Sequence, residues 1–257
     1  MSSSPAALRT LAFGDVTRTV WGAAWIPGGD GSAVAMIGGD AVAPVVSNLR
    51  LSIAEDGSEW RLEGVGFTLI AVPAGEIVDV RAEDDNIVGA DQLCRVTGRF
   101  EQSGAEHAVD CLGLRSSRFG GFELGKLESV RAVSTWFEQP DEGFALTAFR
   151  GRKAKHHDSD VLTATVLGPE PSPAVEDPRL STTYDAGGWP VRAGLELWLA
   201  AEGEDEDAQQ FPRRAAGEAA GARTETAAGD LDLRAEPFRW HSRGREGAGI
   251  YLLARRR

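Results

Sequence analysis

Apolar residues along this chain recur mostly at every second position, in short segments that each end at Gly, Pro, Asp or Asn. This alternation puts apolar side chains on one face of an extended segment, which is typical of β-strands joined by tight turns. One helix is predicted, at 211–221, from a short alanine-rich segment. The predicted strands are 18–25, 33–38, 47–54, 60–72, 94–101, 108–114, 132–138, 144–150, 161–167, 180–184, 191–200, 231–235 and 250–255.

Three pairs of segments resemble each other in the same order along the two halves of the chain. One such match is weak, because β-rich segments resemble each other by chance, but three matches in a fixed order favour an internal duplication. The pairs are 18–39 with 131–151, then 51–69 with 180–199, which aligns Asp56 with Asp185 and Trp60 with Trp189, and finally Phe100 and 111–115 with Phe238 and 251–255.

A duplicated meander of about six strands leaves exposed sheet edges in each half, and closure into a barrel covers those edges. The predicted fold class is therefore all-β, with two tandem related antiparallel β-barrel halves from an internal duplication. We expect the first half to span residues 1–119, a linker to span 120–129, and the second half to span 130–257.

Charge and terminal composition limit the partners of the protein. The formal net charge is −12, from 27 Lys and Arg against 39 Asp and Glu, and this average field repels nucleic acid. The first residues lack the basic start and apolar run of a signal peptide, and no segment approaches the roughly 20 apolar residues of a membrane helix. We therefore expect a soluble, cytoplasmic protein, and the excess of Arg over Lys suggests a bacterial source. The sequence does not predict the oligomeric state.

The residue types that carry chemistry are few. The chain has two cysteines, Cys94 and Cys111, and buried free thiols are favoured over a single disulfide bridge. No phosphate loop, dinucleotide glycine fingerprint, zinc helix or nucleophile elbow is present. His156 and Asp158 belong to a cluster of metal-type ligands, and on a strand they would share one face. A solvated loop is the favoured interpretation of that cluster, so we expect no metal and no cofactor.

Seven tryptophans are many for a chain of this length. Large aromatics at equivalent positions of duplicated barrels usually fill the core or close the barrel ends, and we favour that role for Trp60 and Trp189. Trp21, Trp25 and Trp136 fit either a core or the wall of an apolar ligand cavity. The pair Trp240 and His241 is similar, with a structural histidine favoured over a catalytic acid or base.

Residues 113–120 place two arginines, two serines and one phenylalanine at the joint between the halves. With the strand at 131–138, this segment resembles the middle of the two-domain lipocalin-like family related to hydroxyneurosporene synthase (carotenoid 1,2-hydratase) and tocopherol cyclase. The family pattern there is approximately Gly-x-Arg-Asp-His-Ser-Trp-Gly. Gly113, Arg115 and Gly120 match it, Phe119 replaces the tryptophan, and serines 116 and 117 replace the Asp and His.

The resemblance implies two lipocalin-like barrels with a pocket for a hydrophobic ligand, in relatives that hydrate or cyclise isoprenoids. The serines at 116 and 117 remove the group that would deliver a proton near neutral pH. We therefore predict a protein that binds an apolar small molecule, such as an isoprenoid, polyketide or lipid, and assists a cofactor-free cyclisation or isomerisation. The alternatives are a noncatalytic carrier or sensor and a filled-barrel interaction module. The predicted catalytic residues are Arg115, His156 and Asp158, and the predicted ligand-binding residues are Trp21, Trp25, Phe119, Trp136, Trp240 and His241.

Overall fold

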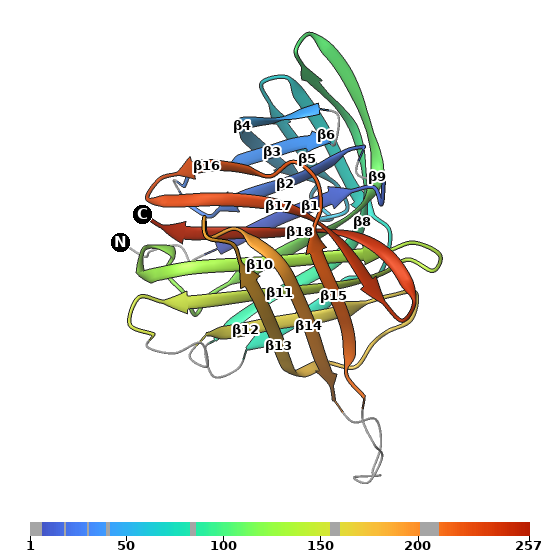
Figure 1. The fold of residues 1–257 in the computed structure, drawn as a ribbon, viewed down its shortest axis with the longest axis vertical. Helices are drawn as coiled ribbons and strands as arrows, with labels where there is room; N and C mark the ends of the chain where they lie inside the picture. Colours follow the sequence, from blue (N-terminus) through green and yellow to red (C-terminus); the bar gives the residue numbers. More distant parts are fainter. Residues whose placement is uncertain are drawn as a thin grey trace.

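The protein folds into two antiparallel β-sheets, each rolled into a barrel, as seen in the computed structural model (Figure 1). The structure describes residues 7–17, 19–29, 31–39, 42–82, 86–154, 160–200 and 211–257. Apart from one short 3-10 helix, Leu124–Lys126, the regular elements in these ranges are strands.

The first sheet forms a closed barrel. Its strands are β1 (Ala7–Gly14), β2 (Trp21–Pro27), β3 (Val34–Gly39), β4 (Val42–Ile53), β5 (Trp60–Gly64), β6 (Phe67–Pro73), β7 (Val78–Ala82), β8 (Ile87–Gln102) and β9 (Ala105–Phe119). Strands β1 to β6 follow one another around the ring, β1 also pairs with β9, and the pairing of β6 with β8 closes it. β7 lies outside the ring and pairs with β8.

The second sheet forms a barrel with one open seam. Its strands are β10 (Leu127–Phe137), β11 (Glu142–Gly151), β12 (Val161–Leu167), β13 (Val175–Tyr184), β14 (Pro190–Leu199), β15 (Arg213–Ala219), β16 (Thr224–Ala228), β17 (Leu231–Ser242) and β18 (Arg245–Arg256). The first strand β10 pairs with the second strand β11 and with the last strand β18, as β1 does with β2 and β9. In the described part of the chain β12 and β13 form no ladder with each other, so the ring stays open there.

The two barrels have the same strand order, from β1 and β10 through to β9 and β18. Two of the three predicted segment matches fall on equivalent strands, namely β4–β5 with β13–β14 and β8–β9 with β17–β18. The first match is wrong by one strand, because 18–39 covers β2 and β3 whereas 131–151 covers β10 and β11. Neighbouring strands of a meander share one apolar pattern, so a shift of one strand leaves the resemblance intact. With the first match lost, internal duplication stays a prediction that rests on the two remaining matches.

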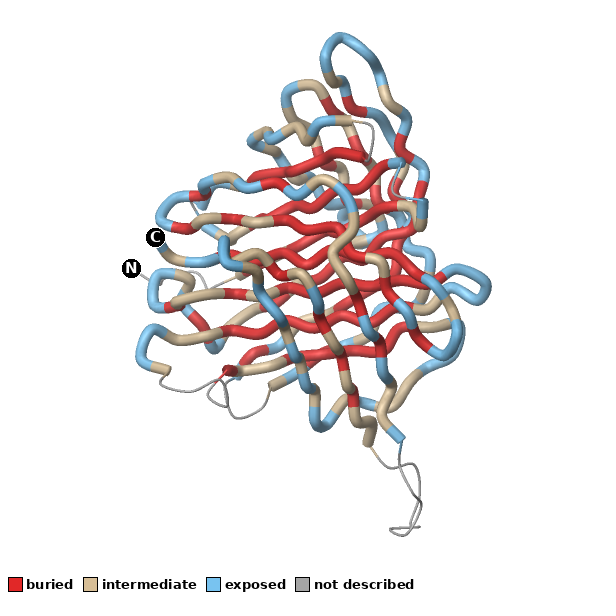
Figure 2. The backbone as a smooth tube through the Cα atoms, in the orientation of Figure 1, coloured by how far each residue is buried: buried red, intermediate tan, exposed pale blue. Residues whose placement is uncertain are grey.

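The central strands are buried on both faces, which explains their continuous apolar runs. In β2, the side chains of Ala24 and Ile26 face the interior of the first barrel, whereas Trp21, Ala23 and Trp25 face the second barrel. One core cluster fills each barrel, and a third lies between the barrels. Figure 2 shows the buried residues concentrated where β1, β2, β10, β11 and β18 run through the middle of the molecule. Outer strands such as β4 alternate between partly buried and exposed residues.

Several sequence-based expectations need correction. The predicted helix at 211–221 is wrong, because Arg213–Ala219 forms strand β15. Its alanines pack in the barrel wall, and pairing with β14 and β17 outweighs the helical preference of alanine. Strands β1, β7 and β16 were not predicted, and β10 begins at Leu127, inside the predicted linker.

Two further sequence-based expectations concern the thiols and the membrane. Cys94 and Cys111 are buried and unpaired, which confirms the favoured interpretation. Burial raises the pKa of the Cys94 thiol to about 12, so it stays protonated. Within the described ranges, no helix is long and apolar enough to cross a membrane.

Candidate functional site

The segment that carries the family resemblance forms the end of β9. Because side chains alternate along a strand, the segment serves two regions at once. Arg115 faces the interior of the first barrel, where its guanidinium contacts Gln92. Arg118 faces the second barrel and contacts Thr163. The two arginines therefore have different roles.

Arg115 is a buried cation that no described carboxylate pairs with. The residue is only 6% exposed. Its Nε and Nη2 donate to Gln92 Oε1, Nη1 donates to the Ser58 carbonyl, and its guanidinium carbon lies 5.4 Å from the centre of the Trp60 ring. Burial lowers the pKa of Arg115, because desolvation disfavours the charged form. Buried charges are normally paired, so an unneutralised guanidinium attracts an anionic or electron-rich group.

Arg115 lines a pocket of about 200 Å³ at the end of the first barrel, which we call the mouth pocket. A second cation, Arg9, also lines it and lies 5.2 Å over the ring of Phe119. Trp60 contributes an apolar wall, and the lining carboxylate of Asp91 is already bound by Arg118. The mouth pocket is therefore cationic and partly aromatic.

A larger groove of about 1,010 Å³ lies between the two barrels, along β7, β8, β12 and the residues before β13. We call it the inter-barrel groove. Its lining is mainly apolar and includes Val80, Val88 and Val166. Ala90 and Phe119 line both the groove and the mouth pocket, so the two cavities border the same two residues.

Arg118 and Asp91 form a fully buried ion pair between the barrels, with side chains 2% and 0% exposed. Both carboxylate oxygens of Asp91 accept bonds from Arg118 at 2.8 Å, and one also accepts from Thr165 of the second barrel. Arg118 Nε donates to Thr163 at 2.9 Å. Each nitrogen of the Arg118 guanidinium and both carboxylate oxygens of Asp91 are hydrogen-bonded, so this network joins the two barrels.

The predicted aromatic residues occupy three different places. Trp21, Trp25 and Trp136 lie in the core between the barrels, at most 1% exposed, and the Trp136 indole donates to the Gly14 carbonyl at 2.9 Å. Trp240 lies inside the second barrel and stacks on Phe238.

The remaining predicted residues are also dispersed. His241 is exposed. His156 and Asp158 lie outside the described residues. Of the predicted set, the structure brings together Arg115 and Phe119. Within the described ranges no group of three or more metal-type ligands is found.

The second barrel contains polar residues that the sequence analysis did not identify. Glu236 lies directly opposite Tyr251 on the interior face of β17 and β18 and is 3% exposed. Its Oε2 has no hydrogen-bond partner in the described part of the chain. Burial raises the pKa of Glu236 to about 7, an effect that Arg223 opposes and Asp185 reinforces. A single acid within the apolar run at 235–238 was the sequence signal for this residue.

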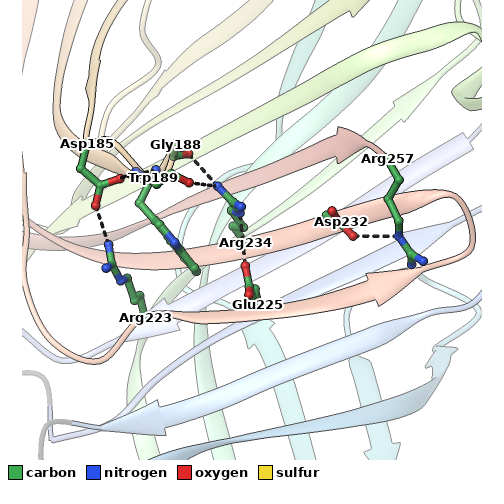
Figure 3. Close-up of polar contacts among 9 residues, drawn as sticks. Asp185, Gly188, Trp189, Arg223, Glu225, Asp232, Arg234 and Arg257 are labelled. Carbon is green, nitrogen blue, oxygen red and sulfur yellow. Dashed lines mark hydrogen bonds and ion pairs between the residues drawn. The ribbon is translucent and has the colours of Figure 1, made fainter.

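The hairpin turn between β13 and β14 lies at one end of the second barrel. Asp185 Oδ1 accepts from the backbone N–H groups of Gly187 and Trp189, and its Oδ2 accepts from Arg223. The Trp189 ring lies between two guanidinium groups, 4.8 Å from Arg223 and 5.0 Å from Arg234 (Figure 3). The equivalent Trp60 likewise contacts an arginine, so in each barrel a cation packs against this tryptophan.

Comparison with known proteins finds similarity in structure alone. No family model matches the chain, and no curated protein matches its sequence. Kievitone hydratase from Nectria haematococca superposes with a TM-score of 0.64 at 10% identity, over 98% of this chain and 89% of that one. A putative AttH from Nitrosomonas europaea gives 0.64 at 10% identity, over 99% and 93%. CghA, solved with Sch210972, gives 0.59 at 10% identity, over 98% and 88%. The chain thus shares the two-barrel, lipocalin-like fold of these proteins, and the resemblance inferred from its sequence is confirmed for the fold.

Proposed function

We propose that this protein binds an apolar small molecule that carries an anionic or electron-rich oxygen. The oxygen lies at Arg115 in the mouth pocket, and the hydrocarbon part extends past Phe119 into the inter-barrel groove. The observation that carries the proposal is the buried guanidinium of Arg115, held by Gln92 with no carboxylate partner among the described residues. The mouth pocket alone is smaller than the about 300–1,000 Å³ of common ligand sites, whereas the groove has the required size.

Arg115 also suits cofactor-free chemistry on such a ligand. A fixed guanidinium stabilises negative charge that develops on a carbonyl or enolate oxygen during cyclisation or isomerisation. Gln92 holds it in place, so little reorganisation is needed when charge develops. The names of the structural neighbours support a small-molecule ligand, since one is a hydratase and another was solved with Sch210972.

A noncatalytic carrier is the second candidate. One observation favours it: the acid that lines the mouth pocket, Asp91, is bound on both oxygens by Arg118, so the described lining offers no free proton donor or acceptor of carboxylate type. Repeated turnover of a bound ligand by catalytic amounts of protein would identify an enzyme, whereas release of unchanged ligand would identify a carrier.

The binding proposal is tested with cis-parinaric acid, a fluorescent apolar carboxylate. The parent protein should bind it, and Arg115→Gln should weaken binding at least tenfold, because the variant removes the charge that faces the carboxylate. Arg95→Gln is the matched control: its side chain lies on neighbouring β8, is 47% exposed and pairs with Asp110. Equal affinity of the parent and Arg115→Gln would refute the proposal, as would an equal loss in Arg95→Gln.

A further inference from the structure

The open end of the second barrel contains a separate pocket of about 540 Å³. It lies where the ends of β10, β11 and β18 meet the hairpin turn between β13 and β14. Its lining shares no residue with the mouth pocket or the inter-barrel groove. Four of the lining residues are arginines, and we therefore call it the arginine pocket. These residues are Arg131, Arg150, Arg152 and Arg255.

The arginine pocket is cationic in a strongly acidic protein. Against its four arginines stand the lining residue Glu128 and Asp160, which pairs with Arg131 beneath it. A local surplus of positive charge in a chain of net charge −12 marks a site for an anion.

The floor of the arginine pocket is held in place by one buried carboxylate. The Asp160 side chain is 1% exposed, Arg131 donates to its Oδ2, and Arg150 Nε lies 3.9 Å from its Oδ1. At the rim, Arg152 and Arg255 are exposed and form no ion pair with any described residue. Two guanidinium groups are thus pre-positioned below, and two others remain available above.

Hydroxyl groups complete the lining. Tyr184 lines the arginine pocket, and its hydroxyl lies 3.2 Å from the hydroxyl of Tyr251, which in turn lies 3.0 Å from Thr182 Oγ1. Burial raises the pKa of Tyr251, so it stays neutral and adds no competing negative charge. A neutral hydroxyl that another hydroxyl orients is a good donor to an anionic oxygen.

We propose that the arginine pocket binds the phosphate group of a small phosphorylated molecule. Arginine forks match phosphate geometry, and a phosphate dianion balances a surplus of two positive charges, which a single carboxylate would not. The pocket has room for more than the phosphate, and the Tyr184 ring offers an apolar contact for the esterified group. This site is formed by residues other than Arg115, so a test of this proposal is independent of a test of the proposed function.

Calorimetric titration of the full chain with phenyl phosphate and with inorganic phosphate at low ionic strength tests the proposal. Both should bind the parent, and Arg255→Gln should weaken both at least tenfold. Arg255 is chosen because its loss leaves no buried acid unpaired. Arg257→Gln is the control of equal charge change, since Arg257 pairs with Asp232 outside the pocket and should leave affinity unchanged.

The two ligands distinguish the source of the phosphate. Tighter binding of phenyl phosphate would assign the site to an esterified group, and tighter binding of inorganic phosphate would assign it to free phosphate. Absence of binding at millimolar concentration would overturn the proposal. An equal loss in Arg255→Gln and Arg257→Gln would also overturn it, because the affinity would then reflect overall charge and not this pocket.

Discussion

The two barrels share a strand order but differ in what their interiors hold. Opposite Cys111, which the sequence match aligns with Tyr251, the first barrel has the apolar Val96 on β8. The second barrel has Glu236 opposite Tyr251 on β17 and β18. The first ring is closed and the buried cation Arg115 lines the pocket at its mouth, whereas in the described residues the second ring is open between β12 and β13.

This difference shows that the wall and the interior of a barrel are set by different residues. The wall depends on backbone pairing and on the face that each barrel buries against the other, and both halves keep one strand order although the second ring is open. The interior depends on single positions such as 96 and 236, which change without altering the strand order. The inter-barrel face should therefore determine stability, and the interiors should determine chemistry.

The largest expected effect follows from Trp136→Ala, which opens a cavity between the barrels and leaves the Gly14 carbonyl unpaired. We expect the free energy of unfolding to fall by about 5 kcal/mol, at the upper end for a buried tryptophan. Chemical denaturation of the parent and the variant measures this difference in the free energy of unfolding. Affinity for cis-parinaric acid should stay unchanged under conditions where the variant is folded, because Trp136 lines neither the mouth pocket nor the inter-barrel groove. A selective loss of binding would move the ligand site to the inter-barrel core.

Arg118→Ala should cost about 3–4 kcal/mol of unfolding free energy, because it leaves Asp91 charged and buried without its partner. Arg95→Ala is the matched control on the same pair of strands, since its ion pair with Asp110 is exposed and contributes about 0–1 kcal/mol. Urea denaturation of both variants measures the contrast. Similar losses in the two variants would show that the buried pair does not join the barrels as described.

Glu236→Gln should change how stability depends on pH. The pKa of Glu236 is raised from 4.5 to about 7 in the folded protein, so the folded state holds a proton that the unfolded chain has lost between these values. The parent should therefore lose stability as the pH rises from about 4.5 to 7, by about 1–3 kcal/mol, and stay at the lower value above that.

The variant lacks this loss, so thermal unfolding should show it to be more stable than the parent at pH 8 and about equal at pH 4. Glu225→Gln, with a side chain 60% exposed, serves as control and should show no such trend. The same difference between Glu236→Gln and the parent at both pH values would contradict the burial of an ionisable Glu236.

The smallest predicted effect is a difference in melting temperature between variants of the two matched turns, one at Asp185 and the other at Asp56. Asp185 accepts two backbone bonds and one from Arg223, and these bonds hold the pKa of its carboxyl below the usual range. Among the described residues, the Asp56 carboxylate accepts only from the backbone N–H and hydroxyl of Ser58. Asp185→Asn should therefore lower the melting temperature by more than Asp56→Asn, as a thermal melt at pH 7 would show. The reverse order would mean that the hydrogen bonds of Asp185 beside Trp189 contribute little to thermal stability.

Sequence reasoning recovered the features that local pattern encodes. The matched turns before Trp60 and Trp189 were found because both carry the same Asp and Gly chemistry. Arg115 and Phe119 were named from the resemblance of residues 113–120 to a family motif, and because they lie four residues apart on β9 they share a face.

Features that depend on distant pairing were missed. Strand β15 has a helix-favouring composition, and only its neighbours β14 and β17 make it a strand. Glu236 looks like an ordinary surface acid until β17 is paired with β18 and placed inside a barrel. The sequence did not decide whether Trp136 is a core residue or part of a ligand cavity, because the hydrogen-bond partner of its indole, the Gly14 carbonyl, lies in the other half of the chain.

We propose that Arg115 recognises the charge of an apolar ligand. This is tested by comparing cis-parinaric acid with its uncharged methyl ester, each bound to the parent and to Arg115→Gln. The parent should prefer the acid, and Arg115→Gln should lose at least tenfold in affinity for the acid while its affinity for the ester changes little. That difference corresponds to about 1.4 kcal/mol of coupling between Arg115 and the ligand charge. Equal losses for the acid and the ester, or none for either, would show that Arg115 does not recognise the ligand charge.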